Sequence, residues 1–330
     1  GMARQKTLAL ALILGITTLT SCDLWQHSDE ADQELAPRQV SALGRIEPLS
    51  GNIKVSVPSA LSNDRVRQIL VEEGQEVKAG TPLAILESQT TLSAEVAQSE
   101  ALIDVARKKL DAQTSVIEEH RAKQAQAEAE AKRARDLYAN GAMSASTSEA
   151  KVARAAVTTA KLHESIANQS TLKAELEVSL ADLEKKKADL ALATVKAPIA
   201  GTVFKINARA GDKVSEAGIL DMGESSRMGV VAEVYQTDRP EIRLGQEATI
   251  TADGFPDKSA KGKVVEISRQ VSTQSVVSGE AGDNVDRRVV EVKIALPQSA
   301  ITEASMVNNL QVNVLFAPLT EQQRQLRTKS

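Results

Sequence analysis

The sequence predicts a mainly β fold that is interrupted by one long, antiparallel helical coiled-coil hairpin. Residues 91–194 contain no proline and a single glycine, Gly141, and consist largely of the strong helix formers Ala, Glu, Lys, Leu and Gln. Short alternating segments with glycine-containing turns flank this stretch, as is typical of β-strands. Each arm of about 47 residues would be roughly 70 Å long at 1.5 Å per residue. We therefore expect the hairpin to project from the β domains.

A seam of apolar and small residues supports the coiled coil, because it recurs at alternating steps of four and three. In the outgoing arm the seam consists of Leu92, Val96, Ser99, Ile103, Ala106, Leu110, Gln113, Ile117, His120, Gln124, Ala127, Ala131 and Ala134. In the returning arm it consists of Val152, Ala155, Thr159, Leu162, Ile166, Gln169, Lys173, Leu176, Leu180, Leu183, Lys187 and Leu190. The seam is most apolar near the base, so we expect the base to hold the hairpin together.

The predicted turn lies at Asn140–Gly141, since glycine adopts the left-handed conformation that ends a helix. Ser146 followed by Glu149 fits a capping box that would restart the helix. The alternative is that the hairpin serves only as a spacer and binds no partner.

Residues 1–21 have the pattern of an export signal. Arg4 and Lys6 precede the short apolar run Leu8–Leu14, which is too short for a permanent membrane span. The sequence Leu-Thr-Ser-Cys that ends at Cys22 resembles the lipobox of bacterial lipoproteins. The resemblance implies cleavage before Cys22 and its acylation, and Asp23 resembles the signal for retention at the inner membrane. A chance cysteine in an ordinary secretory signal is the alternative.

Composition narrows the remaining possibilities. Residues 22–42 are polar and acidic, as expected of a flexible tether. The net charge of −4 and the 2% of aromatic residues argue against a nucleic-acid partner. No segment after the signal reaches a transmembrane length, so the acyl chains at Cys22, the only cysteine, would be the membrane attachment.

Two segments that flank the hairpin, 69–87 and 203–220, share one pattern: a strand, a polar turn with glycines and another strand. This repeat resembles the two halves of a biotinyl/lipoyl domain, here 51–90 and 195–223. In the carrier form of that domain, a lysine at the turn between the halves holds the cofactor. Here the hairpin replaces that turn, and Lys196 stands in another setting, two residues before Pro198. No cofactor is therefore expected.

A split lipoyl domain with an inserted hairpin resembles the plan of HlyD-type membrane fusion proteins, or periplasmic adaptors. At the hairpin end these adaptors carry the pattern Arg-x₃-Leu-x₆-Ser, and this chain has it as Arg133, Leu137 and Ser144. The resemblance implies that these three residues dock on a TolC-like outer-membrane channel. The alternative is that these three residues have no partner and only form a solvated helix end with a helix cap.

The remaining strands resemble two further adaptor domains. Residues 224–275 are expected to form a β-barrel domain, and residues 43–50 with 276–320 a membrane-proximal β domain, followed by a polar tail at 321–330. The motifs Gly-Arg-Ile-Glu-Pro at 44–48 and Arg-Val-Val-Glu-Val-Lys-Ile at 288–294 resemble the DevB branch, which works with ABC exporters.

Catalytic patterns are not found in the sequence. His163 and Glu164 lack the second histidine of a zinc protease helix, and Gly254 to Lys263 has the wrong spacing for a phosphate loop. We therefore expect neither an enzyme nor a metal site.

The resemblance implies a periplasmic adaptor, lipid-anchored to the inner membrane of a double-membrane bacterium. It would join an ABC transporter, with its permease and ATPase, to the channel. The adaptor would form a homo-oligomer, a hexamer by the same resemblance, and the exported substrate would be an amphiphile such as a glycolipid. Three alternatives stay open. They are the adaptor of a proton-driven (RND-type) pump, a biotinyl or lipoyl carrier subunit, and a coiled-coil structural lipoprotein, which would not need two matching β halves.

Overall fold

The computed structural model describes residues 38–254, 259–277, 279 and 287–325. The predicted signal peptide, Cys22 and Asp23 lie outside the described residues. Within the described ranges, none of the helices combines the length and the hydropathy that a membrane crossing requires.

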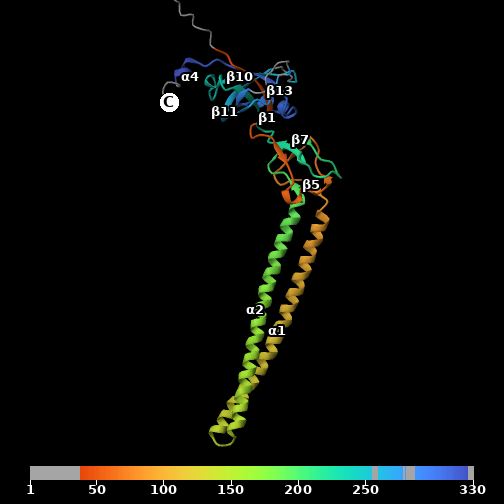
Figure 1. Ribbon diagram of the computed structural model, residues 1–330, viewed down its shortest axis with the longest axis vertical. Helices are drawn as coiled ribbons and strands as arrows, with labels where there is room; N and C mark the ends of the chain where they lie inside the picture. Colours follow the sequence, from red (N-terminus) through yellow and green to blue (C-terminus); the bar gives the residue numbers. More distant parts are fainter. Residues whose placement is uncertain (1–37, 255–258, 278, 280–286, 326–330) are drawn as a thin grey trace, which may run out of the picture. The chain divides into compact units, whose positions relative to one another are not determined.

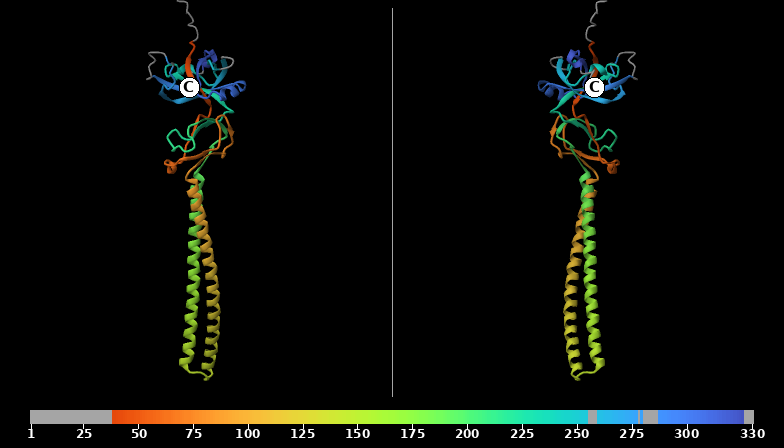
Figure 2. Two further views of the ribbon diagram at one scale, coloured as in Figure 1. Left: turned by 90° about the vertical axis from the view of Figure 1, so that its right-hand side faces the viewer. Right: turned by 90° about the vertical axis from the view of Figure 1, so that its left-hand side faces the viewer.

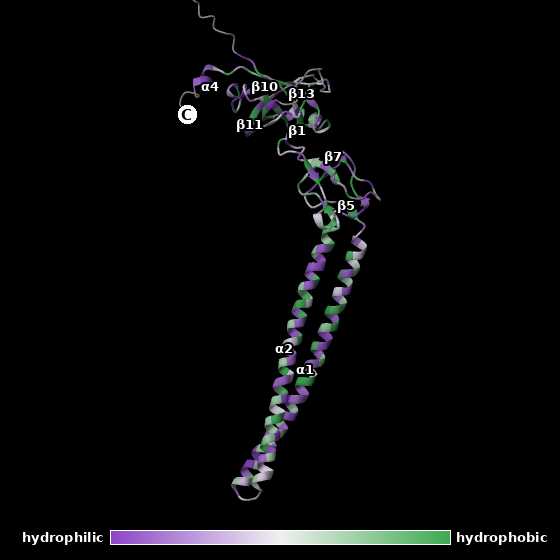
Figure 3. Ribbon diagram, viewed as in Figure 1, coloured by the Kyte–Doolittle hydropathy of each residue, from purple (hydrophilic) through white to green (hydrophobic). Residues whose placement is uncertain are grey.

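The predicted helical hairpin is confirmed. Helix α1 spans Gln89–Ala139 and helix α2 spans Ala145–Leu192, with 51 and 48 residues. The two helices run antiparallel and side by side, and they leave the neighbouring β domain at strands β5 and β6 (Figures 1 and 2). At 1.5 Å per residue, α1 is about 75 Å long. Hydrophilic and hydrophobic residues alternate along both helices, as expected of a pair with one buried seam (Figure 3).

The seam follows the predicted positions closely in α1, where every one of them is buried or half-buried. In α2 the predicted positions Ile166, Lys173 and Lys187 are exposed, and the residue before each takes its place in the seam. At Ser165 the small side chain lets the helices approach, and its carbonyl accepts a hydrogen bond from Gln113 Nε2 at 2.8 Å.

A buried cluster of small side chains lies near the outer end of the hairpin. Ala127, Ala131 and Ala155 form a buried cluster against Val152. At the base, by contrast, Leu92 and the other seam residues nearest the β domain are only half-buried. Nearer the base, Ile103 and Leu183 are buried as well, so the expectation that the base holds the hairpin together stays a prediction. Small alanine side chains allow close approach of the two backbones in the alanine cluster.

The β domain next to the hairpin is assembled from both sides of the hairpin, as the split-domain prediction requires. Before the hairpin it contains β2 (Ile53–Val55), a 3₁₀ turn (Ser59–Leu61), β3 (Val66–Ile69), β4 (Glu76–Val77) and β5 (Pro82–Leu86). After the hairpin it contains β6 (Thr194–Lys196), β7 (Gly201–Ile206) and β8 (Leu220–Gly223). One sheet has the order β2-β8-β7-β4 and the other β3-β5-β6, so each combines strands of the two halves. Leu83, Leu86, Ile219 and Met222 lie in their shared core.

The second β domain is a closed barrel with the strand order β1-β13-β10-β11-β12-β9. Its strands are β1 (Ser41–Pro48), β9 (Met228–Tyr235), β10 (Glu247–Thr251), β11 (Ser259–Thr273), β12 (Arg288–Ala295) and β13 (Gln311–Phe316). Three short helices accompany them, η2 (Arg239–Glu241), α3 (Gln298–Ser305) and α4 (Glu321–Gln325). Alternate side chains from every strand, such as Ile46, Ile294 and Phe316, fill the interior.

The barrel differs from the division into two domains that the sequence suggested. Strands from 224–275 are interleaved around it with strands from 43–50 and 276–320, so these segments form one domain. Strand β1, for example, pairs with both β9 and β13. Such pairing joins strands far apart in the chain, and local sequence patterns carry no information about it.

Candidate docking surface

The end of α1 forms a well-defined helix stop at the predicted place. Gly141 has a φ of +74°. The backbone N–H of Ala142 donates to the carbonyl of Leu137 at 2.8 Å, and that of Gly141 donates to the carbonyl of Tyr138 at 3.0 Å. This pair of bonds is the Schellman arrangement, in which a glycine satisfies the last helical carbonyls. The turn therefore holds the end of the hairpin in a fixed conformation.

Helix α2 is capped by Ser144. The hydroxyl of Ser144 accepts a hydrogen bond from the backbone N–H of Thr147 at 3.3 Å and lies 2.7 Å from the hydroxyl of Thr147. The predicted capping box at Ser146 and Glu149 does not form, because α2 starts at Ala145 and Ser146 already lies in its first turn. Ser144, predicted as a docking residue, thus has a structural task of its own.

The predicted docking residues Arg133, Leu137 and Ser144 are all exposed at the tip. Arg133 and Leu137 are one helical turn apart on α1, and Ser144 lies across the turn on the other arm. Leu137 is 43% exposed, and Tyr138 beside it is 53% exposed. Within the described part of the chain, the guanidinium of Arg133 has no hydrogen bond or ion pair. An apolar side chain and a free cation therefore face outward together.

A buried layer directly behind the tip supports this surface. Ser148 is buried, and its hydroxyl donates to the carbonyl of Ala134 at 3.4 Å across the hairpin. One turn further from the tip, Lys151 Nζ lies 3.2 Å from a carboxylate oxygen of Glu130. The hydrogen bond from Lys151, followed by its charge, lowers the pKa of Glu130. These contacts fix the register of the two arms just behind the exposed residues.

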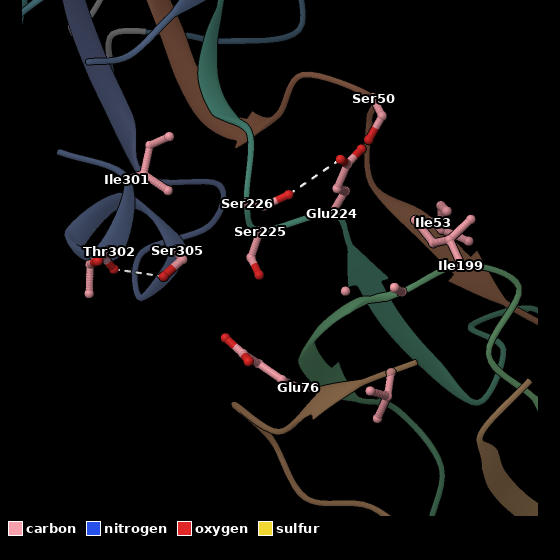
Figure 4. A pocket seen from close by; sticks show the side chains of 13 residues that line it. Ser50, Ile53, Glu76, Ile199, Glu224, Ser225, Ser226, Ile301, Thr302 and Ser305 are labelled. Atoms are coloured by element: carbon pink, nitrogen blue, oxygen red, sulfur yellow. Dashed lines mark hydrogen bonds between the residues drawn. The ribbon is translucent and has the colours of Figure 1, made fainter. Parts of the chain in front are cut away.

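An open groove of about 800 Å³ lies where the split β domain meets helix α3 and the chain segment before β9 (Figure 4). Its acidic side chains are Glu76 and Glu224, and the latter accepts a hydrogen bond from the hydroxyl of Ser226 at 3.3 Å. The lining includes neither histidine nor cysteine. Among the described residues, no group of three or more His, Cys, Asp or Glu side chains could hold a metal ion.

The barrel wall carries a charged cluster that sequence reasoning missed. Glu233 is almost fully buried, with its side chain 1% exposed. Its carboxylate accepts hydrogen bonds from the backbone N–H and the hydroxyl of Ser275, and from the N–H of Val276 at 2.9 Å. Arg45 lies 3.6 Å away. The available signal was a lone glutamate within the otherwise apolar strand Met228–Tyr235.

Arg45 also pairs with Glu47 at 2.9 Å and with Glu291 at 3.4 Å. Partial burial opposes the charged form of the guanidinium, but the carboxylates of Glu47 and Glu291 outweigh that effect and raise the pKa of Arg45. The cluster therefore joins strands β1, β9 and β12 of the barrel wall through ion pairs.

The fold defines a class of protein. A β domain assembled from two halves, with a helical hairpin inserted between them and a β-barrel beside it, is the architecture of a membrane fusion protein, or periplasmic adaptor. The chain matches the family described as "YknX, barrel-sandwich hybrid domain" over residues 57–223, half of its length. The chain belongs to this family and, with it, to the HlyD-type membrane fusion proteins.

Solved structures with the same fold agree with this assignment. MacA from Actinobacillus actinomycetemcomitans is 18% identical, with a TM-score of 0.60, 85% of this chain and 78% of that chain covered. The membrane fusion protein Spr0693 from Streptococcus pneumoniae R6 is also 18% identical, with a TM-score of 0.50, 85% of this chain and 100% of that chain covered. At this identity the likeness concerns the fold. No curated protein matches the chain.

Proposed function

We propose that this membrane fusion protein is the periplasmic adaptor of a tripartite ABC-type exporter, in which it joins an inner-membrane permease and ATPase to a TolC-like outer-membrane channel. The observation that carries the proposal is the tip of the hairpin. There a rigid, capped turn presents Leu137 and the unpaired guanidinium of Arg133 at the far end of two helices of about 75 Å.

The chemistry of the tip fits docking on another protein. Leu137 supplies an apolar anchor that loses water on binding. Arg133 supplies several N–H donors in a fixed fork, which suits carbonyl or carboxylate oxygens at the ends of helices. The Schellman turn and the Ser144 cap keep both side chains in place before binding, so little conformational entropy is lost on docking.

The choice of an ABC transporter rests on the two DevB-like motifs, 44–48 and 288–294. By the same resemblance the exported substrate is an amphiphile such as a glycolipid. A proton-driven (RND-type) pump is the alternative partner. The carrier alternative is disfavoured by the position of Lys196, which ends the edge strand β6 and pairs there with Pro82, whereas a carrier lysine occupies the turn between the two halves.

The oligomer proposed here, a ring of hexameric type, is supported by an exposed apolar stripe on α1. Leu102, Val105 and Val116 are 56%, 48% and 37% exposed. Their spacing of three and eleven residues places them on one side of α1, about a quarter turn from the seam. Such a stripe suits lateral packing against another copy of the chain. Native mass spectrometry of the lipidated protein in detergent would test it, with Leu102→Ser/Val116→Ser expected to reduce the ring to smaller species.

The anchor proposal concerns Cys22 and Asp23. Cys22→Ala is expected to abolish incorporation of labelled fatty acid, because the thiol is the acylation site. The matched variant Asp23→Ser is expected to keep the label and to move the protein from the inner to the outer membrane fraction. Incorporation of label into Cys22→Ala at the wild-type level would contradict the proposed anchor.

The complete proposal is tested by purifying the tagged adaptor from cross-linked membranes and identifying its partners by mass spectrometry. We expect an ABC permease and ATPase together with a TolC-like channel. The tip variant Arg133→Asp/Leu137→Ala is expected to retain the permease and ATPase and to lose the channel. Recovery of a proton-driven pump in place of the ATPase would overturn the ABC assignment.

A further inference from the structure

Tyr138 is the largest apolar side chain exposed at the hairpin tip, and the Arg-x₃-Leu-x₆-Ser pattern does not include it. Its side chain is 53% exposed in a chain with only 2% aromatic residues. Its hydroxyl has no hydrogen bond within the described ranges. Tyrosine buries a large rigid area and keeps one polar atom, which makes it a frequent anchor of protein interfaces.

The position of Tyr138 explains its exposure. It follows Ala131 by seven residues and Ala134 by four, so it continues the buried seam of α1. Ser148 lies opposite Ala134, because its hydroxyl donates to the Ala134 carbonyl. Four residues back along the second arm, the same antiparallel register places Ser144 opposite Tyr138. The seam of α1 thus ends in an exposed aromatic ring, and the residue across the hairpin in this register, the N-cap Ser144, is small.

Ser144, in contrast, already has hydrogen-bond partners within the chain. Its hydroxyl accepts from the N–H of Thr147 and contacts the Thr147 hydroxyl at 2.7 Å. A serine that caps a helix in this way contributes about 0.5–2 kcal/mol to the helix. Its small size also leaves the ring of Tyr138 uncovered. A branched or long side chain at position 144 would cover the ring.

We propose that Tyr138 is the aromatic anchor of the docking surface, and that Ser144 acts only as a positioning residue, by capping α2 and leaving the ring exposed. This inference rests on the proposed function and names a further residue of the same surface. With Leu137, the preceding residue of α1, Tyr138 gives the end of the hairpin two large exposed apolar side chains, called the apolar patch below.

The charges around the patch indicate the chemistry of its partner. Lys132 and Arg133 are exposed, and within the described residues neither has an anionic partner. Arg135 is engaged with Glu128 at 3.8 Å. The tip therefore fits an apolar pocket rimmed by carbonyl or carboxylate oxygens, as the ends of helices provide. Under the proposed function this pocket lies between the periplasmic helix ends of the outer-membrane channel.

The test measures binding of the full-length lipidated adaptor to the TolC-like channel of the source bacterium, purified in detergent. We expect Tyr138→Ala to weaken binding about tenfold or more and Tyr138→Phe to bind within about threefold of wild type. Val178→Ala, which truncates an exposed apolar residue far from the tip on α2, serves as the matched control and is expected to bind as wild type.

Ser144→Gly separates the two roles of the serine. Glycine lacks the hydroxyl but is small and weakens an N-cap by only a few tenths of a kcal/mol. We therefore expect Ser144→Gly to bind within about threefold of wild type, and Ser144→Val, which removes the cap and covers the ring, to bind at least tenfold more weakly. Hydrogen exchange of the Thr147 amide is expected to accelerate in Ser144→Val.

Unchanged binding by Tyr138→Ala would overturn the inference, and so would a tenfold loss of binding in Ser144→Gly. Either result leaves the proposed function intact if Arg133→Asp/Leu137→Ala still loses the channel. Undiminished binding by that double variant would instead contradict the proposed docking site itself. Thermal unfolding of each variant by circular dichroism verifies that the hairpin is folded.

Discussion

The guanidinium of Arg45 lies 3.4 Å from the carboxylate of Glu291, although the two residues are 246 positions apart in the chain. Arg45 is on β1 and Glu291 on β12, and strand β9 lies between them in the barrel. The side chain of Arg45 therefore reaches across β9. This contact joins the two motifs, 44–48 and 288–294, that were noted separately in the sequence.

The first prediction concerns this cluster. Arg45→Met is expected to lower the free energy of unfolding by about 3 kcal/mol, because it leaves the buried carboxylate of Glu233 without its cation. Glu291→Gln removes a partner whose side chain is 40% exposed, so a loss below about 1 kcal/mol is expected. Urea denaturation measures both. If the two variants lose the same free energy of unfolding, the burial of Glu233 does not determine how much Arg45 contributes to stability.

The second prediction explains the glycine of the first motif. A Cβ on Gly44 would lie 2.8 Å from the carbonyl oxygen of Val231 and 3.0 Å from a side-chain carbon of Val230 on the neighbouring strand. Gly44→Ala is therefore expected to destabilise the barrel by about 1–3 kcal/mol. Gly254→Ala is the control, because its Cβ would meet only the flexible side chain of Leu310. If both variants unfold at the same urea concentration, the close approach of β1 and β9 does not restrict the size of the side chain at position 44.

The third prediction tests the alanine packing near the tip. Ala131 is fully buried between the helices. Ala131→Leu is expected to force them apart and to lower hairpin stability by about 1–3 kcal/mol. Ala129→Leu places the same side chain on an exposed position of α1, where little change is expected. Hydrogen exchange across α1 and α2 measures the effect, and equal protection in both variants would contradict the packing.

The fourth prediction concerns pH. Lys151 holds the pKa of Glu130 below its ordinary value of 4.5, by its hydrogen bond first and its charge second, with a smaller effect from Gln126. Because the folded pKa is lowered, the pair stabilises the tip above pH 4.5, and this contribution is lost as the pH falls through the folded pKa.

Carboxyl NMR titration of Glu130 checks that prediction. Lys151→Ala is expected to return the pKa of Glu130 toward 4.5, and Gln126→Ala to return it by less. A pKa that does not move in Lys151→Ala would mean that the ion pair does not form in solution.

The hairpin could be predicted well because its signals are local. Helix-forming composition, the seam and the stop at Gly141 are all read from neighbouring residues. The N-cap of α2 was predicted at the wrong serine, because the sequence of Ser146 and Glu149 also fits a capping box. In the structure Ser144 takes the extended conformation at the start of α2, and its side chain accepts the hydrogen bond of the cap. Ile166 was preferred to Ser165 because hydropathy favours the larger residue, although close helix packing favours the smaller one.

The barrel could be predicted only strand by strand. Strand β9, Met228–Tyr235, lies within the segment 224–275 that the sequence predicted to form β structure. Its pairing with β1 and β12, however, joins it to strands at distant positions, and nothing in a single sequence fixes those partners. The cluster at Glu233 was missed for the same reason, because Arg45 and Ser275 meet it only after the barrel closes.

The central claim is that the hairpin tip docks on the channel, and Leu137→Ala probes it with least disturbance. Leu137 is 43% exposed in the free chain, so the free energy of unfolding is expected to change by less than about 0.5 kcal/mol. At a desolvated interface the same truncation costs about 1–2 kcal/mol per copy, a loss of roughly 5- to 30-fold in affinity. Val157→Ala, 54% exposed on α2 away from the tip, is the matched control.

The most direct measurement is therefore the dissociation constant between the purified channel and the adaptor with Leu137→Ala, Arg133→Asp or both. We predict that each variant folds and forms rings as the wild type does, that each binds the channel at least fivefold more weakly, and that the double variant shows no binding. Wild-type affinity of the double variant for the channel would contradict the account.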